Sequence, residues 1–203
     1  MSPIAGIVVA ASGGRRIGGP EALLARGGTL LVDEVVDIAT EIGCRPVVVV
    51  LGAAANQVRS TARLKGTTIV VDKAWGTGLG SSLRVGLAAL DDTHAEAALV
   101  MTVDMPGVTV EAARRVAALP YRDALVCATY DGMRSYPMLF GRRHWPGIST
   151  LAKSNVGARP YLLAHKNEII DIACDAVAEG IRIESPELVA AFGLTVPGQR
   201  GTE

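Results

Sequence analysis

Short runs of continuously apolar residues recur along this chain, and segments with helical periodicity separate them. The first run, residues 4–11, ends at Gly13 and Gly14 and predicts a strand buried on both faces. Similar strands are predicted at residues 46–51, 67–71 and 97–103, and helices at 29–42, 54–64, 81–90 and 109–119. Strands that alternate with helices over short links form a parallel sheet with helices on both faces. The sequence therefore predicts an α/β fold.

The pattern changes after residue 120. Strands are predicted at residues 125–130 and 137–140, joined by a turn at 131–132, and a further strand at 169–174. Helices are predicted at residues 155–165 and from residue 186 onward. The expected helix caps are Ser81 or Ser82, Thr109 and Ser185. We expect one domain over residues 1–203, with 198–203 as a flexible tail.

Composition excludes several classes of protein. Lys and Arg total 20 and Asp and Glu total 20, so the formal net charge is zero, which argues against nucleic-acid binding. The three cysteines have no metal-site or redox spacing, and small buried side chains of a reducing compartment are expected. No apolar run is long enough to span a membrane, and no secretory signal precedes residue 4. A soluble, cytoplasmic protein is expected.

In open α/β sheets, ligands bind beyond the carboxyl ends of the strands, here residues 12–21, 52–56, 75–84 and 104–107. Residues 12–19 form a glycine-rich loop that contains Arg15 and Arg16. Backbone amides in such a loop approach anions closely, and arginine forks neutralise phosphate. Phosphate binding is favoured over the alternative, a purely structural turn.

Two further segments could carry chemistry. Asp104 follows a buried strand and precedes Pro106, where a carboxylate suits Mg²⁺, although a capping or turn aspartate has the same pattern. Residues 75–84 form a glycine-rich loop that leads into a helix, and the serines there could bind a base or a sugar. The alternative is a capped helix after a mobile loop.

These segments, with Val156-Gly157-Ala158-Arg159, occur in the order and spacing of one family. Over residues 4–193 the chain resembles the MobA-like nucleotidyltransferases, above all the branch with molybdenum cofactor cytidylyltransferase. The resemblance implies a three-layer α/β sandwich of the nucleotide-diphospho-sugar transferase type, with a Rossmann-like, mostly parallel sheet. It implies Arg16 and Asp104 as catalytic residues and Mg²⁺ held by Asp104 and Glu184. The nucleotide-binding residues it implies are Ala10, Ala11, Ser12, Gly13, Gly14, Arg16, Gly80, Ser81 and Ser82.

The activity implied is transfer of CMP, or GMP, from a nucleoside triphosphate to a phosphorylated acceptor such as molybdopterin, with release of pyrophosphate. Several site residues depart from the family pattern. Glu21 stands where the family has lysine, Arg182 where it has an aspartate of the second metal segment, and Asn155 where it has another aspartate. These changes favour an alternative, a non-catalytic relative that binds a nucleotide or a pterin. A sugar-nucleotide-forming transferase is a further alternative, and the sequence does not indicate the oligomeric state.

Overall fold

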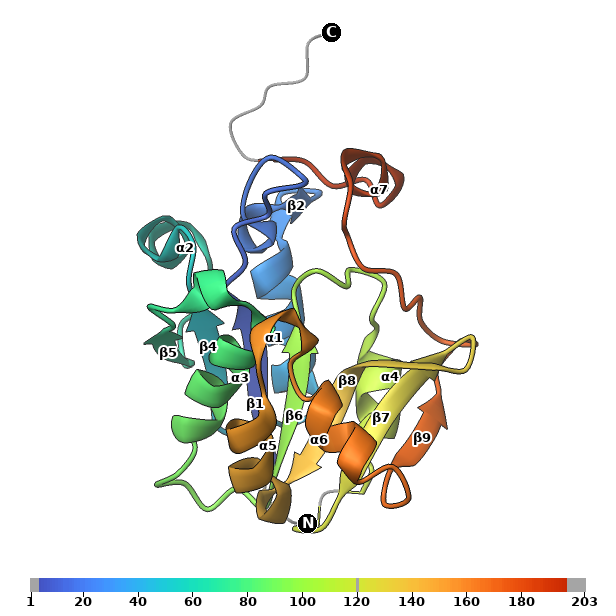
Figure 1. Ribbon diagram of the computed structural model, residues 1–203. Helices are drawn as coiled ribbons and strands as arrows, with labels where there is room; N and C mark the ends of the chain where they lie inside the picture. Colours follow the sequence, from blue (N-terminus) through green and yellow to red (C-terminus); the bar gives the residue numbers. More distant parts are fainter. Residues whose placement is uncertain (1–3, 120, 197–203) are drawn as a thin grey trace, which may run out of the picture.

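The computed structural model describes residues 4–119 and 121–196, so the tail expected at residues 198–203 lies outside the described part. A seven-stranded sheet runs through the molecule (Figure 1). All neighbouring strands are parallel except the two pairs that contain β8, which confirms the mostly parallel sheet. In spatial order the strands are β5 (Thr68–Val71), β4 (Val47–Leu51), β1 (Ile4–Ala10), β6 (Ala97–Thr102), β8 (Met133–Gly141), β7 (Leu125–Tyr130) and β9 (Ile170–Ala173).

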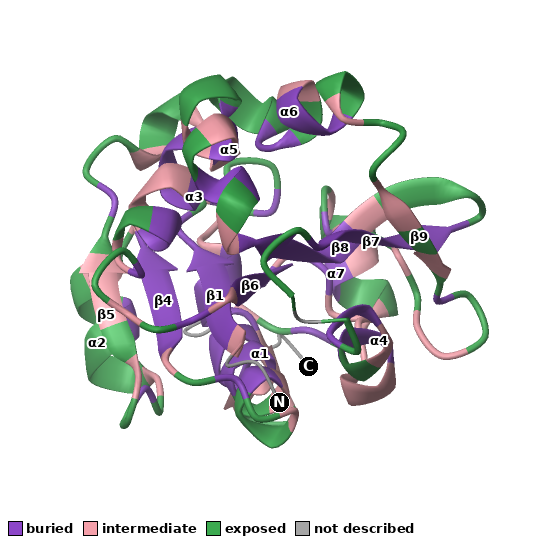
Figure 2. Ribbon diagram, turned by 90° about the horizontal axis from the view of Figure 1, so that it is seen from below, coloured by how far each residue is buried: buried purple, intermediate pink, exposed green. Residues whose placement is uncertain are grey.

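Helices cover both faces of this sheet, as the α/β prediction requires (Figures 1 and 2). One face carries α1 (Leu31–Glu41) and α4 (Val110–Val116), and the other carries α3 (Leu79–Ala88), α5 (Trp145–Leu151) and α6 (Arg159–Ala164). The remaining helices are α2 (Ala55–Thr61) and α7 (Pro186–Ala191). Short 3₁₀ turns lie at Glu21–Leu23, Trp75–Thr77, Arg142–His144 and Ser154–Val156. None of the helices in the described ranges is long and apolar enough to cross a bilayer.

The central strands form the core because neighbours shield them on all sides. Every residue of β4 is buried, and Figure 2 shows the inner strands in purple between helices with exposed outer faces. Cys44, Cys127 and Cys174 are buried and free, as expected. Burial raises the pKa of the Cys44 thiol to about 12, so it stays protonated and unreactive at neutral pH.

The predicted helix at residues 29–42 begins two residues late. Gly27 and Gly28 both have positive φ angles and turn the chain back on itself. The small hairpin of β2 (Ala25–Arg26) and β3 (Thr29–Leu30) therefore precedes α1. Glycine adopts this left-handed conformation without steric cost, and tight hairpins select it for that reason.

Capping by Ser81 or Ser82 is wrong, because α3 begins at Leu79 with Gly78 as its N-cap and no side-chain cap. Both serines lie inside the helix, where their hydroxyls have another partner. The other two caps are confirmed: Thr109 Oγ1 accepts from the Ala112 amide, and Ser185 accepts from the Leu188 amide.

The predicted helix at residues 155–165 is interrupted. Gly157 has a φ of 53°, which ends the turn at residues 154–156, and α6 begins only at Arg159. The helix α5 was not predicted from the sequence. The strand β8 begins four residues before the predicted strand at 137–140. In β8 the pairing with β7 and β6 decides the length, and a single-sequence pattern does not contain that pairing.

Candidate functional site

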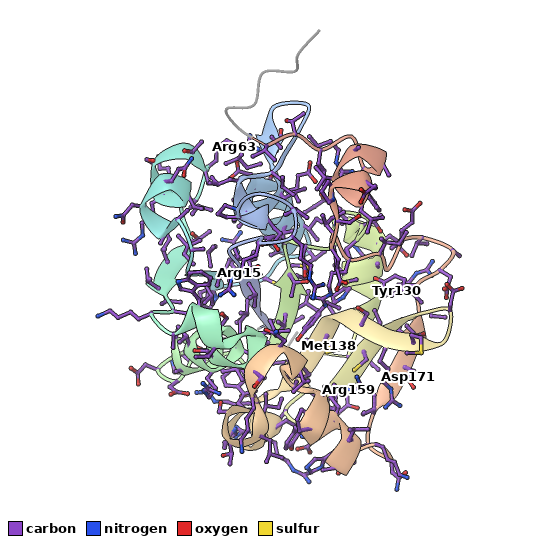
Figure 3. The ribbon with its side chains drawn as sticks, turned by 45° about the horizontal axis from the view of Figure 1, so that its top comes forward. Arg15, Arg63, Tyr130, Met138, Arg159 and Asp171 are labelled. Carbon is purple, nitrogen blue, oxygen red and sulfur yellow. The ribbon has the colours of Figure 1, made fainter. Side chains whose placement is uncertain are left out.

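The loops at the carboxyl ends of the strands surround a cleft of about 1040 Å³. The glycine loop after β1 forms one wall, and the tip of the β7–β8 hairpin with residues 155–163 forms a second. Figure 3 labels Arg15 on the first wall and Arg159 on the second. Three of the four segments that were predicted to bind ligand contribute to the cleft, but residues 52–56 do not. Gly52 is covered by Trp75, since a Cβ on this glycine would lie 2.6 Å from Trp75 Cβ.

The glycine loop folds back on itself. The amides of Ile17 and Gly19 donate to the carbonyl oxygen of Gly14 over 3.0 and 3.2 Å, and the Gly14 amide donates to Ser12 Oγ over 3.3 Å. Gly14 has a φ of 56°, and a Cβ there would lie 1.7 Å from the Gly19 carbonyl oxygen, so only glycine fits. This turn presents Arg15 to the cleft.

Glu21, which replaces the family lysine, lies buried where the loop ends, with 7% of its surface exposed. Its Oε1 accepts from Ser12 Oγ over 3.0 Å, whereas its Oε2 is buried and has no partner among the described residues. Burial raises the pKa of the Glu21 carboxyl above its usual value, and the hydrogen bonds to it oppose that shift. The negative charge of Asp104 raises this pKa further, and the charge of Arg182 lowers it.

Asp104 follows β6 and lines the cleft. Arg182 Nη1 donates to its Oδ2 over 2.5 Å, while Oδ1 is buried without a partner among the described residues. The Ile183 amide donates to the Asp104 carbonyl oxygen over 2.7 Å, so the backbone fixes the segment that carries Arg182. The expected metal-binding carboxylate thus has one oxygen occupied by a cationic side chain and one oxygen available.

Glu184, the second expected metal ligand, is paired differently. Arg16 Nη1 donates to Glu184 Oε2 over 3.1 Å, and the two side chains are 74% and 55% exposed. Such an exposed pair is worth about 0–1 kcal/mol. A bound phosphate could therefore separate Arg16 from Glu184 at little cost.

Ser81 and Ser82, which were predicted to bind the nucleotide, form hydrogen bonds with a buried aspartate of the protein instead. Ser81 Oγ donates to Asp72 Oδ1 and Ser82 Oγ donates to Asp72 Oδ2, each over 2.9 Å, and all three side chains are buried. Asp72 also accepts from the Ala74 amide over 2.8 Å. No motif in the sequence points to Asp72, and its position directly after a predicted strand is the one feature that could have indicated a role in the site.

Three of the predicted nucleotide-binding residues, Ala10, Gly80 and Ser81, do not line the cleft, whereas the others do. Gly80 packs against the backbone of the next layer, since a Cβ there would lie 2.6 Å from the Lys153 amide nitrogen. This glycine allows α3 to approach the segment after α5.

The second wall combines charged and apolar side chains. Arg134 donates to both oxygens of Asp171 over 2.6 and 2.8 Å, a bidentate pair that joins the hairpin to β9. Met133 and Leu163 are exposed, and both line the cleft. Figure 3 shows Asp171 and Arg159 on this side of the molecule. The wall therefore suits a ligand with both anionic and apolar parts.

Among the described residues that line the cleft, arginines outnumber aspartates and glutamates. Arg16, Arg134 and Arg182 each pair with one carboxylate. Among the described residues, Arg15 and Arg159 form no ion pair, and both are exposed. Unpaired arginines on two walls of one cleft favour an anionic ligand.

Within residues 4–119 and 121–196, no group of three or more His, Cys, Asp or Glu side chains is arranged to hold a metal ion. Mg²⁺ does not require such a group, because it binds one or two carboxylates and takes its other ligands from water and substrate phosphates. The partnerless Oδ1 of Asp104 fits that requirement.

The MobA-like NTP transferase domain family matches residues 6–169. Among curated proteins, the chain is 32% identical over 193 residues to the nicotine blue oxidoreductase of Paenarthrobacter nicotinovorans. The match covers 91% of this chain and 93% of that protein.

Solved structures share the fold. Rv0371c of Mycobacterium tuberculosis H37Rv has a TM-score of 0.82 and 25% identity, over 94% of this chain and 97% of that chain. A complex of Rv0371C with manganese has a TM-score of 0.78 at the same identity and coverage. Mth528, a nucleotidyl transferase from Methanothermobacter, has a TM-score of 0.77 and 18% identity, over 94% of this chain and 97% of that chain. Such likeness confirms the predicted fold class.

Proposed function

The chain belongs to the family of MobA-like NTP transferase domains, and we propose that it is a metal-dependent nucleotidyltransferase. It transfers CMP, or GMP, from the nucleoside triphosphate to the phosphate of an acceptor, and the resemblance suggests molybdopterin as that acceptor. An acceptor phosphate oxygen bonds to the α-phosphorus. The bond from the α-phosphorus to the bridging oxygen breaks, and pyrophosphate leaves with the electron pair.

The observation that carries this proposal is the position of Arg15 and Arg159 on two walls of one cleft without carboxylate partners among the described residues. A nucleoside triphosphate and a phosphorylated acceptor each present phosphate oxygens to such side chains. The volume of about 1040 Å³ is at the upper end of the range for small-molecule sites, ~300–1,000 Å³, as a site for two ligands would be.

Positioning and charge neutralisation are the main tasks of a protein in phosphoryl and nucleotidyl transfer. The backbone of residues 12–14, with Arg15 and Arg16, binds the triphosphate. Ser82 lies on the nucleoside side of the cleft, and Ala10, Gly80 and Ser81 hold the surrounding backbone in place. Arg159 binds the phosphate of the acceptor.

Asp104 is the residue proposed to hold the divalent metal, through the oxygen that has no protein partner. Glu184 would also be free to hold the metal when the triphosphate binds Arg16, which otherwise pairs with Glu184. A divalent cation bound there would neutralise charge on the phosphates as pyrophosphate leaves. The manganese complex of the similar Rv0371C supports a metal of this kind.

A thermal-shift screen with CTP, GTP, ATP and UTP, each with and without Mg²⁺, tests which nucleotide the protein binds and whether binding requires the metal. A ligand present at about 100 times its Kd adds about 2.7 kcal/mol of stability. We expect a selective shift with CTP or GTP that requires Mg²⁺, followed by pyrophosphate release when molybdopterin is added. The absence of a shift with all four triphosphates would refute the proposal.

A second candidate is an oxidoreductase, because the match to nicotine blue oxidoreductase extends over nearly the whole of both chains. The pairing of Asp104 with Arg182 also favours it, since the guanidinium competes with a metal ion for the Asp104 carboxylate. The test adds nicotine blue, the compound in the name of that relative, with a supplied electron donor or acceptor, and follows the dye by absorbance. Turnover of the dye without any triphosphate shift would favour this candidate.

A further inference from the structure

Two carboxylate oxygens in the cleft are buried without hydrogen-bond partners among the described residues: Glu21 Oε2 and Asp104 Oδ1. The partner oxygen of each is occupied, Glu21 Oε1 by Ser12 and Asp104 Oδ2 by Arg182. A buried carboxylate oxygen without a partner is costly, so structures keep it where a ligand satisfies it.

The two carboxylates belong to one local group of charges. Both residues line the same cleft, and after burial, the main cause, the charge of Asp104 adds to the raised pKa of Glu21. Arg182 supplies one positive charge against the two carboxylates, so the ionised group has a deficit of one positive charge. A divalent cation, with two positive charges, would more than offset that deficit and could accept both oxygens as ligands.

We propose that Glu21 is a ligand of the divalent cation and that Glu21 Oε2 and Asp104 Oδ1 bind the same ion. This inference rests on the proposed function for the role of the metal, and it assigns Glu21 a task that the sequence analysis did not. Carboxylate oxygens are the ligands that Mg²⁺ and Mn²⁺ prefer, and two of them suffice when water completes the shell.

Asp171 provides a matched comparison. It is also a carboxylate that lines the cleft, but both of its oxygens accept from Arg134. Asp171 should therefore contribute little to metal binding. Comparing Glu21 with Asp171 separates a coordinating carboxylate from a general effect of negative charge in the cleft.

The test is binding of Mn²⁺ alone, without nucleotide, measured by the loss of the free-ion electron paramagnetic resonance signal and by calorimetry. We expect one bound ion in the wild type. Glu21→Gln and Asp104→Asn should each weaken binding by at least about tenfold, whereas Asp171→Asn should change it by less than about twofold. Glu21→Asp, which keeps the charge but shortens the side chain, should give an intermediate loss.

The double variant Glu21→Gln/Asp104→Asn should lose less affinity than the product of the two single losses, because both residues coordinate one ion. Unchanged affinity in a folded Glu21→Gln variant, or no Mn²⁺ binding by the wild type at millimolar concentration, would overturn the inference. Because no nucleotide is present, a chain that binds Mn²⁺ through Glu21 but transfers no nucleotide would refute the proposed function alone.

Discussion

Arg182 and Asp104 are 78 residues apart in sequence, yet the Arg182 guanidinium donates to Asp104 Oδ2 over 2.5 Å. The backbone supports the contact, because the Ile183 amide donates to the Asp104 carbonyl oxygen. A cationic side chain therefore lies on the carboxylate that the family resemblance assigns to a metal ion. Arg182 lowers the negative charge of the site and competes with any cation for Asp104.

Arg182→Gln should strengthen Mn²⁺ binding in the absence of nucleotide by about three- to tenfold, because the competing charge is removed from Asp104. Electron paramagnetic resonance of free Mn²⁺ measures the change. Arg143→Gln is the control, since Arg143 pairs with Asp123 over 3.3 Å and does not line the cleft. Weaker Mn²⁺ binding by Arg182→Gln would mean that the guanidinium organises the metal site.

Asp104→Asn should abolish metal-dependent pyrophosphate release and leave the fold intact. The amide keeps the size of the carboxylate and an oxygen that can accept from Arg182, but it loses the charge that holds a hard cation. Pyrophosphate release measures the loss of activity, and thermal melts of the same preparation check that the fold is intact. Normal turnover in the folded variant would show that Asp104 is a turn residue.

Glu21→Gln should make the metal-free protein more stable at neutral pH. Burial raises the pKa of Glu21 above its usual value of 4.5, so the stability that this carboxyl contributes is present below that value and is lost as pH rises through its folded-state pKa. Glutamine mimics the protonated form. With a chelator present, we expect the Tm of Glu21→Gln to exceed that of the wild type at about pH 8.

The advantage of Glu21→Gln should disappear toward about pH 4, where the wild-type carboxyl is itself protonated in both states. Melts over the whole pH range follow this convergence. A difference in Tm that stays constant with pH would show that the effect comes from hydrogen bonding or packing and not from the charge of Glu21.

Ser82→Ala should destabilise the protein more than Ser81→Ala. Asp72 Oδ2 accepts only from Ser82 among the described residues, whereas Oδ1 accepts from both Ser81 and the Ala74 amide. Loss of Ser82 leaves a buried carboxylate oxygen without a partner, at a cost of about 1–3 kcal/mol. Denaturant melts of both variants rank them, and equal losses would contradict this account of Asp72.

Gly80→Ala should lower Tm by about 2–12 °C, because the new methyl group would lie 2.6 Å from the Lys153 amide nitrogen and overpacking costs ~1–3 kcal/mol. Gly76→Ala is the matched control, since a Cβ at Gly76 meets nothing within 4 Å. Nucleotide affinity of the folded Gly80→Ala variant should stay within about twofold of wild type if Gly80 acts only through packing.

Sequence patterns predicted the central strands β1, β4 and β6 well, because strands buried on both faces are continuously apolar. The caps at Thr109 and Ser185 were also predictable, since one side chain and a nearby amide make each of them. The patterns failed where distant partners decide the conformation. Ser81 and Ser82 have good capping chemistry, but Asp72 from a neighbouring segment takes both hydroxyls.

The sequence by itself determined the fold class, three of the loops that contribute to the cleft, and the placement of Arg16 and Asp104 beside it. Local hydrophobic periodicity and the topology of parallel sheets are enough for that. Only the tertiary structure decided how the charges pair: Arg182 on Asp104, Glu184 on Arg16, and Glu21 buried against Ser12. Pairing and burial depend on distances between segments far apart in sequence, and those distances exist only once the chain has folded.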